Sequence, residues 1–321
     1  MKTTGANMLL EDVNNLTQDE LALYVRIANY YYRGYLTQNE IATRLRMSRQ
    51  RVNRILSKCM SLGIVEIRIK NDVSAYLEME TALEEKYKLR AVRVAGLATD
   101  DEDSFQLIGE CGARFLAETI QDNDIIGFSR GSTLSALVAG MPPVKRQNLM
   151  VTQLMGGWNN HINNVDGDSI VIRFGEQTAA KINMLYAPVL VSDPSVRDNI
   201  LQEPHYQTSY AVMKSCTIAV LGIADIRHAN FPSLEQLNLA MPATATGEIC
   251  ARPFDACGKP VSTSFDRQII AIETDDLKRI PLRIGVAGMP HKTEAILGAI
   301  RGGYINALVT DVTVASALLD K

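Results

Sequence analysis

From about Leu89 to the C-terminus, short apolar runs alternate with segments of helical character. The runs are AVRVAG, DIIGFS, NLMVTQLM, APVLVSD, TIAVLGI, IIAIE, LRIGVAG and NALVTD. Continuous apolar runs of this length are typical of buried, largely parallel strands covered by helices on both faces. We therefore expect a Rossmann-like α/β domain over residues 90–321, with its ligand at the carboxyl ends of the strands.

The N-terminal part of the chain predicts a different architecture, made of short helices. Apolar residues at helical spacing favour a first helix over residues 20–32, which Gly34 ends. Thr37 and Glu40 have the S/T-x-x-E spacing of a capping box, so a second helix is expected over residues 38–45.

A third helix is expected over residues 49–60, capped by Ser48. One side of it is apolar (Val52, Ile55, Leu56, Cys59) and the other is polar (Arg49, Gln50, Arg51, Asn53, Arg54, Lys58). The small Ala42 lets the second and third helices approach closely. The spacing of Gln38, Ala42, Val52 and Ile55 is similar to that in the helix-turn-helix of bacterial repressors, whose second helix enters the major groove. Many such motifs have Gly where this chain has Arg46, so the turn either accepts an uncommon backbone angle or is built differently.

Positive charge is concentrated in the same region. Residues 21–70 contain ten Lys or Arg against two Glu, although the whole chain has a net charge of −3. One basic segment on an otherwise acidic protein is what DNA binding by a single module requires, because phosphate neutralisation supplies much of the affinity.

The polar side of the third helix supplies the predicted base contacts. Arg can pair with guanine, and Gln or Asn with adenine, so Gln50, Arg51 and Arg54 are the leading candidates. Gln38, Ser48, Arg49 and Asn53 are expected to contact bases or phosphates. A three-helix interaction module with a charged face is the alternative.

Two segments connect this module to the α/β domain. Residues 63–69 (GIVEIRI) alternate like a strand and predict a small wing, giving an all-α (winged) helix-turn-helix domain over residues 1–71. Residues 72–89 predict a linker helix. Its apolar stripe either forms a dimer or packs on the C-terminal domain.

The run DIIGFSRGSTLSALVAG, residues 124–140, leads from a strand through a loop of small residues into a helix. Hydroxyls, free backbone amides and a guanidinium would meet there at a helix N-terminus, which is an arrangement that favours phosphate. The residues concerned are Ser129, Arg130, Gly131, Ser132 and Thr133. An unoccupied capped turn is the alternative.

The same loop formally matches the G-x-S-x-G motif of serine hydrolases at Gly127 to Gly131. That mechanism needs a histidine near Ser129, and His161, His205, His228 and His291 offer no evident triad.

Two further segments predict ligand contacts. Lys292 falls in the first turn of a helix, where the helix dipole disfavours a cation, so a contact with an anionic ligand is expected. An exposed lysine without a ligand is the alternative. Asp255 precedes an Ala-Cys-Gly-Lys-Pro turn, where it could bind sugar hydroxyls or simply cap the turn.

Taken together, these motifs carry a family resemblance. YYYRGYLTQNEIATRLRMSRQRVNRIL, GFSRGSTL, LMGGW, GEICARPFDACGKPV, GVAGMPHKTEAI and RGGYINALVTDVTVASALL occur in an order that resembles the SorC family of sugar-binding transcriptional regulators. The resemblance spans nearly the whole chain. It implies an effector domain related in fold to phosphosugar isomerases, a phosphorylated sugar or polyol as effector, and a homo-tetramer built as a dimer of dimers on operator DNA.

By motif, the resemblance makes the Ser129–Thr133 loop a phosphate site, and Asp255 and Lys292 effector contacts. Gln153 and Glu248 match further effector positions. This chain departs from the family at Arg130 and at Met289-Pro290-His291, where many relatives have a Gly-rich run; both border the pocket and leave the effector's identity open.

Composition excludes several other classes of protein. No apolar run approaches the roughly 20 residues of a membrane helix, and Met1 to Leu10 lack a signal-peptide layout, so a soluble, cytoplasmic protein is expected. The five cysteines form no C-x-x-C pair, so neither a metal nor a cofactor is expected.

The function expected from all of this is a non-enzymatic, DNA-binding transcription regulator of a carbohydrate catabolic operon. The alternative from another class is a phosphosugar isomerase with a DNA-binding head, which would need a general base beside its phosphate site. A metabolite-binding scaffold would leave the basic segment unexplained.

Overall fold

The computed structural model describes residues 16–65, 74–98, 100–157, 167–228 and 239–321. The chain divides into two compact units, residues 1–71 and 72–321, and each is described by itself.

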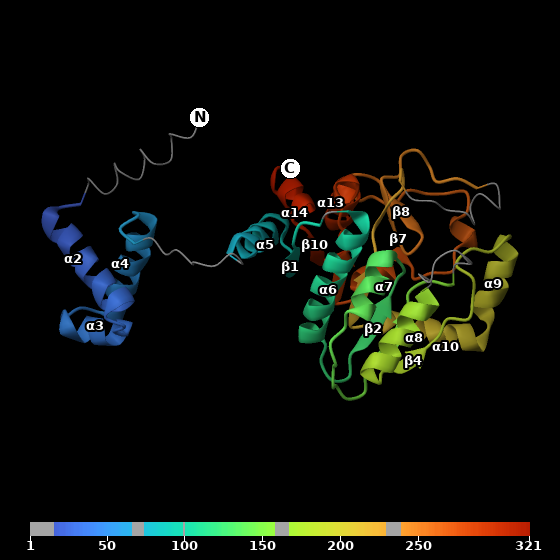
Figure 1. Ribbon diagram of the computed structural model, residues 1–321, viewed down its shortest axis with the longest axis horizontal. Coiled ribbons are helices and arrows are strands. Elements are labelled where there is room, and N and C mark those ends of the chain that lie inside the picture. Colours follow the sequence, from blue (N-terminus) through green and yellow to red (C-terminus); the bar gives the residue numbers. More distant parts are fainter. Residues whose placement is uncertain (1–15, 66–73, 99, 158–166, 229–238) are drawn as a thin grey trace. The chain divides into compact units, whose positions relative to one another are not determined.

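The N-terminal unit is a bundle of short helices (Figure 1). Helix α2 (Gln18–Ala28) runs on into a π-helical turn, η1 (Asn29–Arg33), and is followed by α3 (Gln38–Arg44) and α4 (Arg49–Ser61). The predicted capping box at Thr37 is confirmed, and Thr17 forms a second one that starts α2. The core comprises Ile27, Ala28, Ile41, Ala42, Val52, Ile55, Leu56 and Cys59, all buried.

The turn between α3 and α4 resolves the question raised by Arg46. Arg46 has φ +48°, in the left-handed region that usually favours glycine, and the Met47 amide donates to the Ala42 carbonyl at 3.0 Å. The turn therefore has the usual conformation of such motifs, with arginine at a position where glycine would be less strained.

The predicted wing is described only in part. The Val65 amide donates to the Cys59 carbonyl at 3.0 Å, which closes the end of α4. Residues 66–69 lie outside the described part of the chain.

The C-terminal unit contains the expected parallel sheet, of seven strands in the order β1-β10-β9-β5-β2-β3-β4. Its strands are β1 (Ala91–Ala95), β2 (Ile125–Phe128), β3 (Met150–Gln153), β4 (Lys181–Asn183), β5 (Ile218–Leu221), β9 (Leu282–Val286) and β10 (Ala307–Asp311). A smaller antiparallel sheet joins β6 (Ala224–Asp225), β7 (Gly247–Ile249) and β8 (Arg252–Phe254).

Helices cover both faces of the main sheet. One face packs on α6 (Asp101–Thr119), α7 (Ser132–Ala139) and α8 (Gly167–Thr178), which lie side by side in Figure 1. The other face packs on α5 (Ser74–Tyr87), α10 (Pro204–Lys214), α13 (Thr293–Arg301) and α14 (Val312–Leu319). The remaining helices are α9 (Pro194–Gln202), η2 (Asp266–Gln268), α12 (Thr274–Arg279) and η3 (Pro290–Lys292). The two helical layers make this a doubly wound α/β unit.

Two of the predicted strands are not strands of this sheet. Segments 187–193 and 269–273 form only isolated bridges, Leu190 with Ile269, Pro188 with Gly157 and Ala271 with Met155. Pro188 has no amide hydrogen to donate to a ladder, which is one reason that the first segment stays outside. The edge strand β4 was not predicted.

Helix α5 packs on the C-terminal unit, which was one of the two alternatives for the linker. Leu83 is fully buried there, and the Glu80 and Glu84 carboxylates accept hydrogen bonds from the Val94 and Val92 amides, each at 2.8 Å. Among the described residues, no helix is both long and apolar enough to cross a bilayer.

Candidate functional site

The cationic side of helix α4 lies at the surface of the N-terminal unit. Val52, Ile55, Leu56 and Cys59 face the core, while Arg49, Gln50, Arg51, Asn53, Arg54 and Lys58 are exposed. The predicted division of the helix into an apolar and a polar side is therefore confirmed. A duplex can reach every predicted base-contacting side chain on this helix.

Three of the other predicted DNA contacts are also engaged in local structure. The Ser48 hydroxyl accepts a hydrogen bond from the Arg51 amide at 3.2 Å and so caps α4. Gln38 Nε2 donates to Asn53 Oδ1 at 3.3 Å, which links the start of α3 to the exposed side of α4. These bonds hold the polar side of α4 in one arrangement.

The C-terminal unit has a cavity of about 180 Å³ at the carboxyl ends of its central strands. From β2 the chain proceeds through β3 to β4 at one edge, whereas from β5 it proceeds through β9 to β10 in the other direction. The neighbouring strands β2 and β5 thus mark the topological switch point, where ligands bind in open α/β sheets. The lining residues include Ser129, Arg130, Gly131, Ser132, Thr133, Glu248 and Lys292, all of which the sequence predicted as effector contacts.

The loop between β2 and α7 is held open toward this cavity by backbone contacts. The Ser129 amide donates to the Val220 carbonyl at 3.0 Å, and the Ser129 hydroxyl accepts from the Gly222 amide at 2.8 Å. A side chain at Gly222 would come within 2.5 Å of the Arg130 carbonyl oxygen, so only glycine fits there. Gly131 has φ +144°, and no side chain of a described residue caps the N-terminus of α7. The first amides of α7 are therefore suited to bind an anion.

Charged side chains complete the cavity. Lys292 lies directly before α13, with Nζ 6.0 Å from the centre of the Phe105 ring. Burial raises the pKa of Glu248, while Arg130, a hydrogen bond from the Ala251 amide and Lys292 act to lower it. Two cations thus face one carboxylate, and the excess positive charge favours an anion.

Two predicted effector contacts lie elsewhere. Asp255 Oδ1 accepts hydrogen bonds from the Cys257 and Lys259 amides, both at 2.9 Å, so Asp255 caps its own turn and does not line the cavity. The buried Gln153 accepts a hydrogen bond from the Leu185 amide at 2.8 Å and is not a lining residue either. For Asp255 the alternative of turn capping describes the structure better.

Several lining residues were not predicted from sequence. They are Phe105, Leu134, Met155, Gly222, Ile223, Ala224, Cys250 and Val286. Gly222 could have been found, because it directly follows a buried strand, where a close backbone approach is common. The apolar ones carry no local signal that separates a cavity wall from a core.

The hydrolase interpretation finds no support in this geometry. The Ser129 hydroxyl is bonded to the Gly222 amide, and of the three described histidines none lines the cavity. His205 stacks on Tyr186, and the rings of His228 and His291 lie 4.9 Å apart. His161 lies outside the described residues.

A helix-turn-helix unit joined to an α/β unit with a cavity at its topological switch point is the architecture of a ligand-controlled DNA-binding protein. Residues 71–320 match the Sugar-bind family, described as "Putative sugar-binding domain", and residues 32–66 match a winged helix-turn-helix DNA-binding family. The chain belongs to the SorC family of sugar-binding transcriptional regulators. The predicted family, fold class and general function are confirmed.

Individual relatives extend over both units. The Sorbitol operon regulator of Klebsiella pneumoniae is 31% identical over 94% of this chain and 98% of its own length. The Deoxyribonucleoside regulator of Bacillus subtilis (strain 168) is 29% identical over 95% of this chain and 99% of its own. The crystal structure of full-length SorC from Klebsiella pneumoniae superposes with a TM-score of 0.71 at 28% identity, covering 94% of this chain and all of that one.

Proposed function

We propose that this protein controls a carbohydrate catabolic operon, with operator DNA bound by α4 and a phosphorylated sugar or polyol bound in the cavity at the β2–β5 switch point. The observation that carries the proposal is the uncapped N-terminus of α7 placed in one cavity with Arg130 and Lys292. Backbone amides and two cations suit a phosphate. Glu248, which also lines the cavity, suits sugar hydroxyls as an acceptor.

The apolar wall of the cavity supports a ligand with a short carbon skeleton. Phe105, Met155 and Val286 offer surface to C–H groups, and a cavity of about 180 Å³ suits a small metabolite better than a nucleotide. The protein is proposed to act on DNA in the cytoplasm as the tetramer that the family resemblance implies, and to perform no catalysis.

The proposal is tested by fluorescence anisotropy on duplex DNA from upstream of the protein's own gene. Titrations are repeated with pentose, hexose and polyol phosphates, each beside its unphosphorylated form. We expect salt-sensitive DNA binding that only one or a few of the phosphorylated compounds change, by about fivefold or more. DNA binding that no phosphorylated compound alters would contradict the assignment of the cavity.

The Lys292→Met variant locates the effector site. We expect its DNA affinity to remain unchanged and its effector affinity to fall by about tenfold or more, since a hydrogen bond to a charged group is worth about 1.5–3 kcal/mol. Lys145→Met, at an exposed lysine outside the cavity, is the matched control. Equal loss in both variants would show a general effect of charge.

A phosphosugar isomerase is the second candidate, because the half-buried Glu248, whose carboxyl pKa is raised by desolvation, lies in the proposed phosphate cavity. Raised carboxyl pKa values are typical of general acids and bases. Turnover of pentose and hexosamine phosphates, lost in Glu248→Gln, would establish it. We expect no turnover.

A further inference from the structure

The hairpin of β7 and β8 has two faces with different surroundings. Glu248 and Cys250 line the anion cavity on one face. Arg252, on the other strand, is paired with Ile249 rather than Glu248, so it lies on the opposite face. A movement of this hairpin therefore changes both the wall of the cavity and the position of Arg252.

The turn of this hairpin is strained. Cys250 has φ +53° and Ala251 has φ +60°, which are the angles of a type I′ turn, where Asn and Gly are the usual residues. One side-chain bond spans the turn, from the Ala251 amide to Glu248 Oε2 at 2.7 Å. The carboxyl group that stabilises the strained turn thus also lines the effector cavity.

Arg252 is also incompletely satisfied. Its side chain is only 13% exposed, and Nη2 lies 2.9 Å from Glu273 Oε1. Nη2 is thus paired with that carboxylate, whereas the buried Nε has no hydrogen-bond partner within the described part of the chain. A buried donor without an acceptor is uncommon and calls for an explanation, such as a second arrangement in which it is paired.

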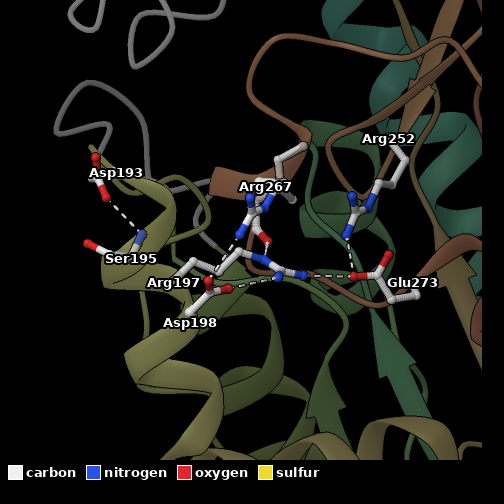
Figure 2. Close-up of polar contacts among 8 residues, drawn as sticks. Asp193, Ser195, Arg197, Asp198, Arg252, Arg267 and Glu273 are labelled. Carbon is white, nitrogen blue, oxygen red and sulfur yellow. Dashed lines mark hydrogen bonds and ion pairs between the residues drawn. The ribbon is translucent and has the colours of Figure 1, made fainter.

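Glu273 connects Arg252 to helix α9. Figure 2 shows Arg197, from α9, and Arg252 approaching the same carboxylate from two sides. Arg197 Nη2 and Arg252 Nη2 both lie 2.9 Å from Glu273 Oε1, and Arg197 Nε donates to the Ile269 carbonyl at 2.7 Å. A shift of Arg252 therefore changes the surroundings of the Glu273 carboxylate, which holds Arg197 of α9.

Resting on the anion site proposed above, we infer that the β7–β8 hairpin passes occupancy of the cavity to helix α9. An anion that takes Arg130 and Lys292 removes the positive charges that favour the Glu248 carboxylate. The bond from the Ala251 amide then weakens and the strained turn relaxes. Arg252 then leaves Glu273, and the carboxylate that holds Arg197 of α9 loses one of the two cations that position it. The hairpin is the two-state element that such coupling requires.

Hydrogen–deuterium exchange of the full-length protein, with and without saturating inorganic phosphate, tests this route. In the parent protein we expect slower exchange at residues 129–134, where the anion binds. We expect faster exchange, by about fivefold or more, in the hairpin and in α9.

The Ala251→Gly variant relieves the strain that drives the change, because glycine adopts positive φ freely. We expect the protection at residues 129–134 to remain and the faster exchange in α9 to disappear. Ala179→Gly is the matched control: Ala179 has φ +55° at the end of α8, outside the cavity and the hairpin, and its variant should behave like the parent.

The outcomes separate this inference from the proposed function. No protection at residues 129–134 would contradict the anion site itself. Protection there without a change in α9, or a change in α9 that persists in Ala251→Gly, would overturn the role of the hairpin.

Discussion

The two units of this protein use arginine in opposite ways. On α4, Arg49, Arg51 and Arg54 point outward and are exposed. In the C-terminal unit, Arg197 and Arg252 are folded inward, with side chains 17% and 13% exposed, against the carboxylate of Glu273. Exposed cations suit DNA, a long polyanion whose binding affinity falls as the salt concentration rises. Inward cations paired with one carboxylate instead link elements of the fold, here α9 and β8.

The largest effect is expected from Gly222→Ala, which disturbs the C-terminal unit alone. The new methyl group would lie 2.5 Å from the Arg130 carbonyl oxygen, so we expect a loss of about 2–3 kcal/mol in the free energy of unfolding. Chemical denaturation measures the loss. Gly96→Ala, where the nearest atom would be 3.9 Å away, should be nearly neutral, and equal losses in both would contradict the close contact.

Arg51→Ala removes one exposed arginine of α4 and leaves the C-terminal unit unchanged. We expect a loss of about 1–3 kcal/mol in specific DNA binding and a relaxed base preference at one position of the operator. Effector affinity should not change. Anisotropy titrations with single-base variants of the operator provide the measurement, and a uniform loss for all sequences would make Arg51 a phosphate contact instead.

Arg46→Gly tests the turn between α3 and α4 in the N-terminal unit. Glycine accepts φ +48° without strain but is more flexible in the unfolded chain, so the net gain should be about 0.5 kcal/mol. Denaturant midpoints measure it. A loss of stability would mean that the Arg46 side chain contributes to the fold.

The smallest effect is a difference in the pH dependence of stability. Hydrogen bonds from the Thr17 and Thr37 amides lower the pKa values of Glu20 and Glu40. Each therefore stabilises the N-terminal unit above pH 4.5, and that contribution is lost as the pH falls through the lowered value. Burial raises the pKa of Glu248, so its contribution has the opposite sign: it is present below pH 4.5 and lost as the pH rises through the raised value.

Melting temperatures of the parent and of Glu248→Gln, measured below and above pH 4.5, test whether Glu248 lowers stability as the pH rises. The variant should gain stability relative to the parent as the pH rises. If Glu248→Gln instead becomes relatively less stable at higher pH, the carboxylate must be stabilised by the cavity more than burial penalises it.

By itself, the sequence determined the local features of this protein. The capping box at Thr37, the apolar side of α4 and the loop from Ser129 to Thr133 each depend on residues only a few positions apart. Hydrogen bonds and packing at such spacing are formed by the segment alone, so its pattern of residues predicts them. The order of motifs along the whole chain also predicted the family.

Only the tertiary structure decided which residues share the cavity. The Ser129 hydroxyl meets the Gly222 amide across 93 positions, and Glu248 joins them from a separate sheet. Asp255 carries the same kind of signal in the sequence, yet its carboxylate is taken up by its own turn. Strand order and the competition of nearby amides for each carboxylate decide these outcomes, because contacts between distant segments leave no local pattern.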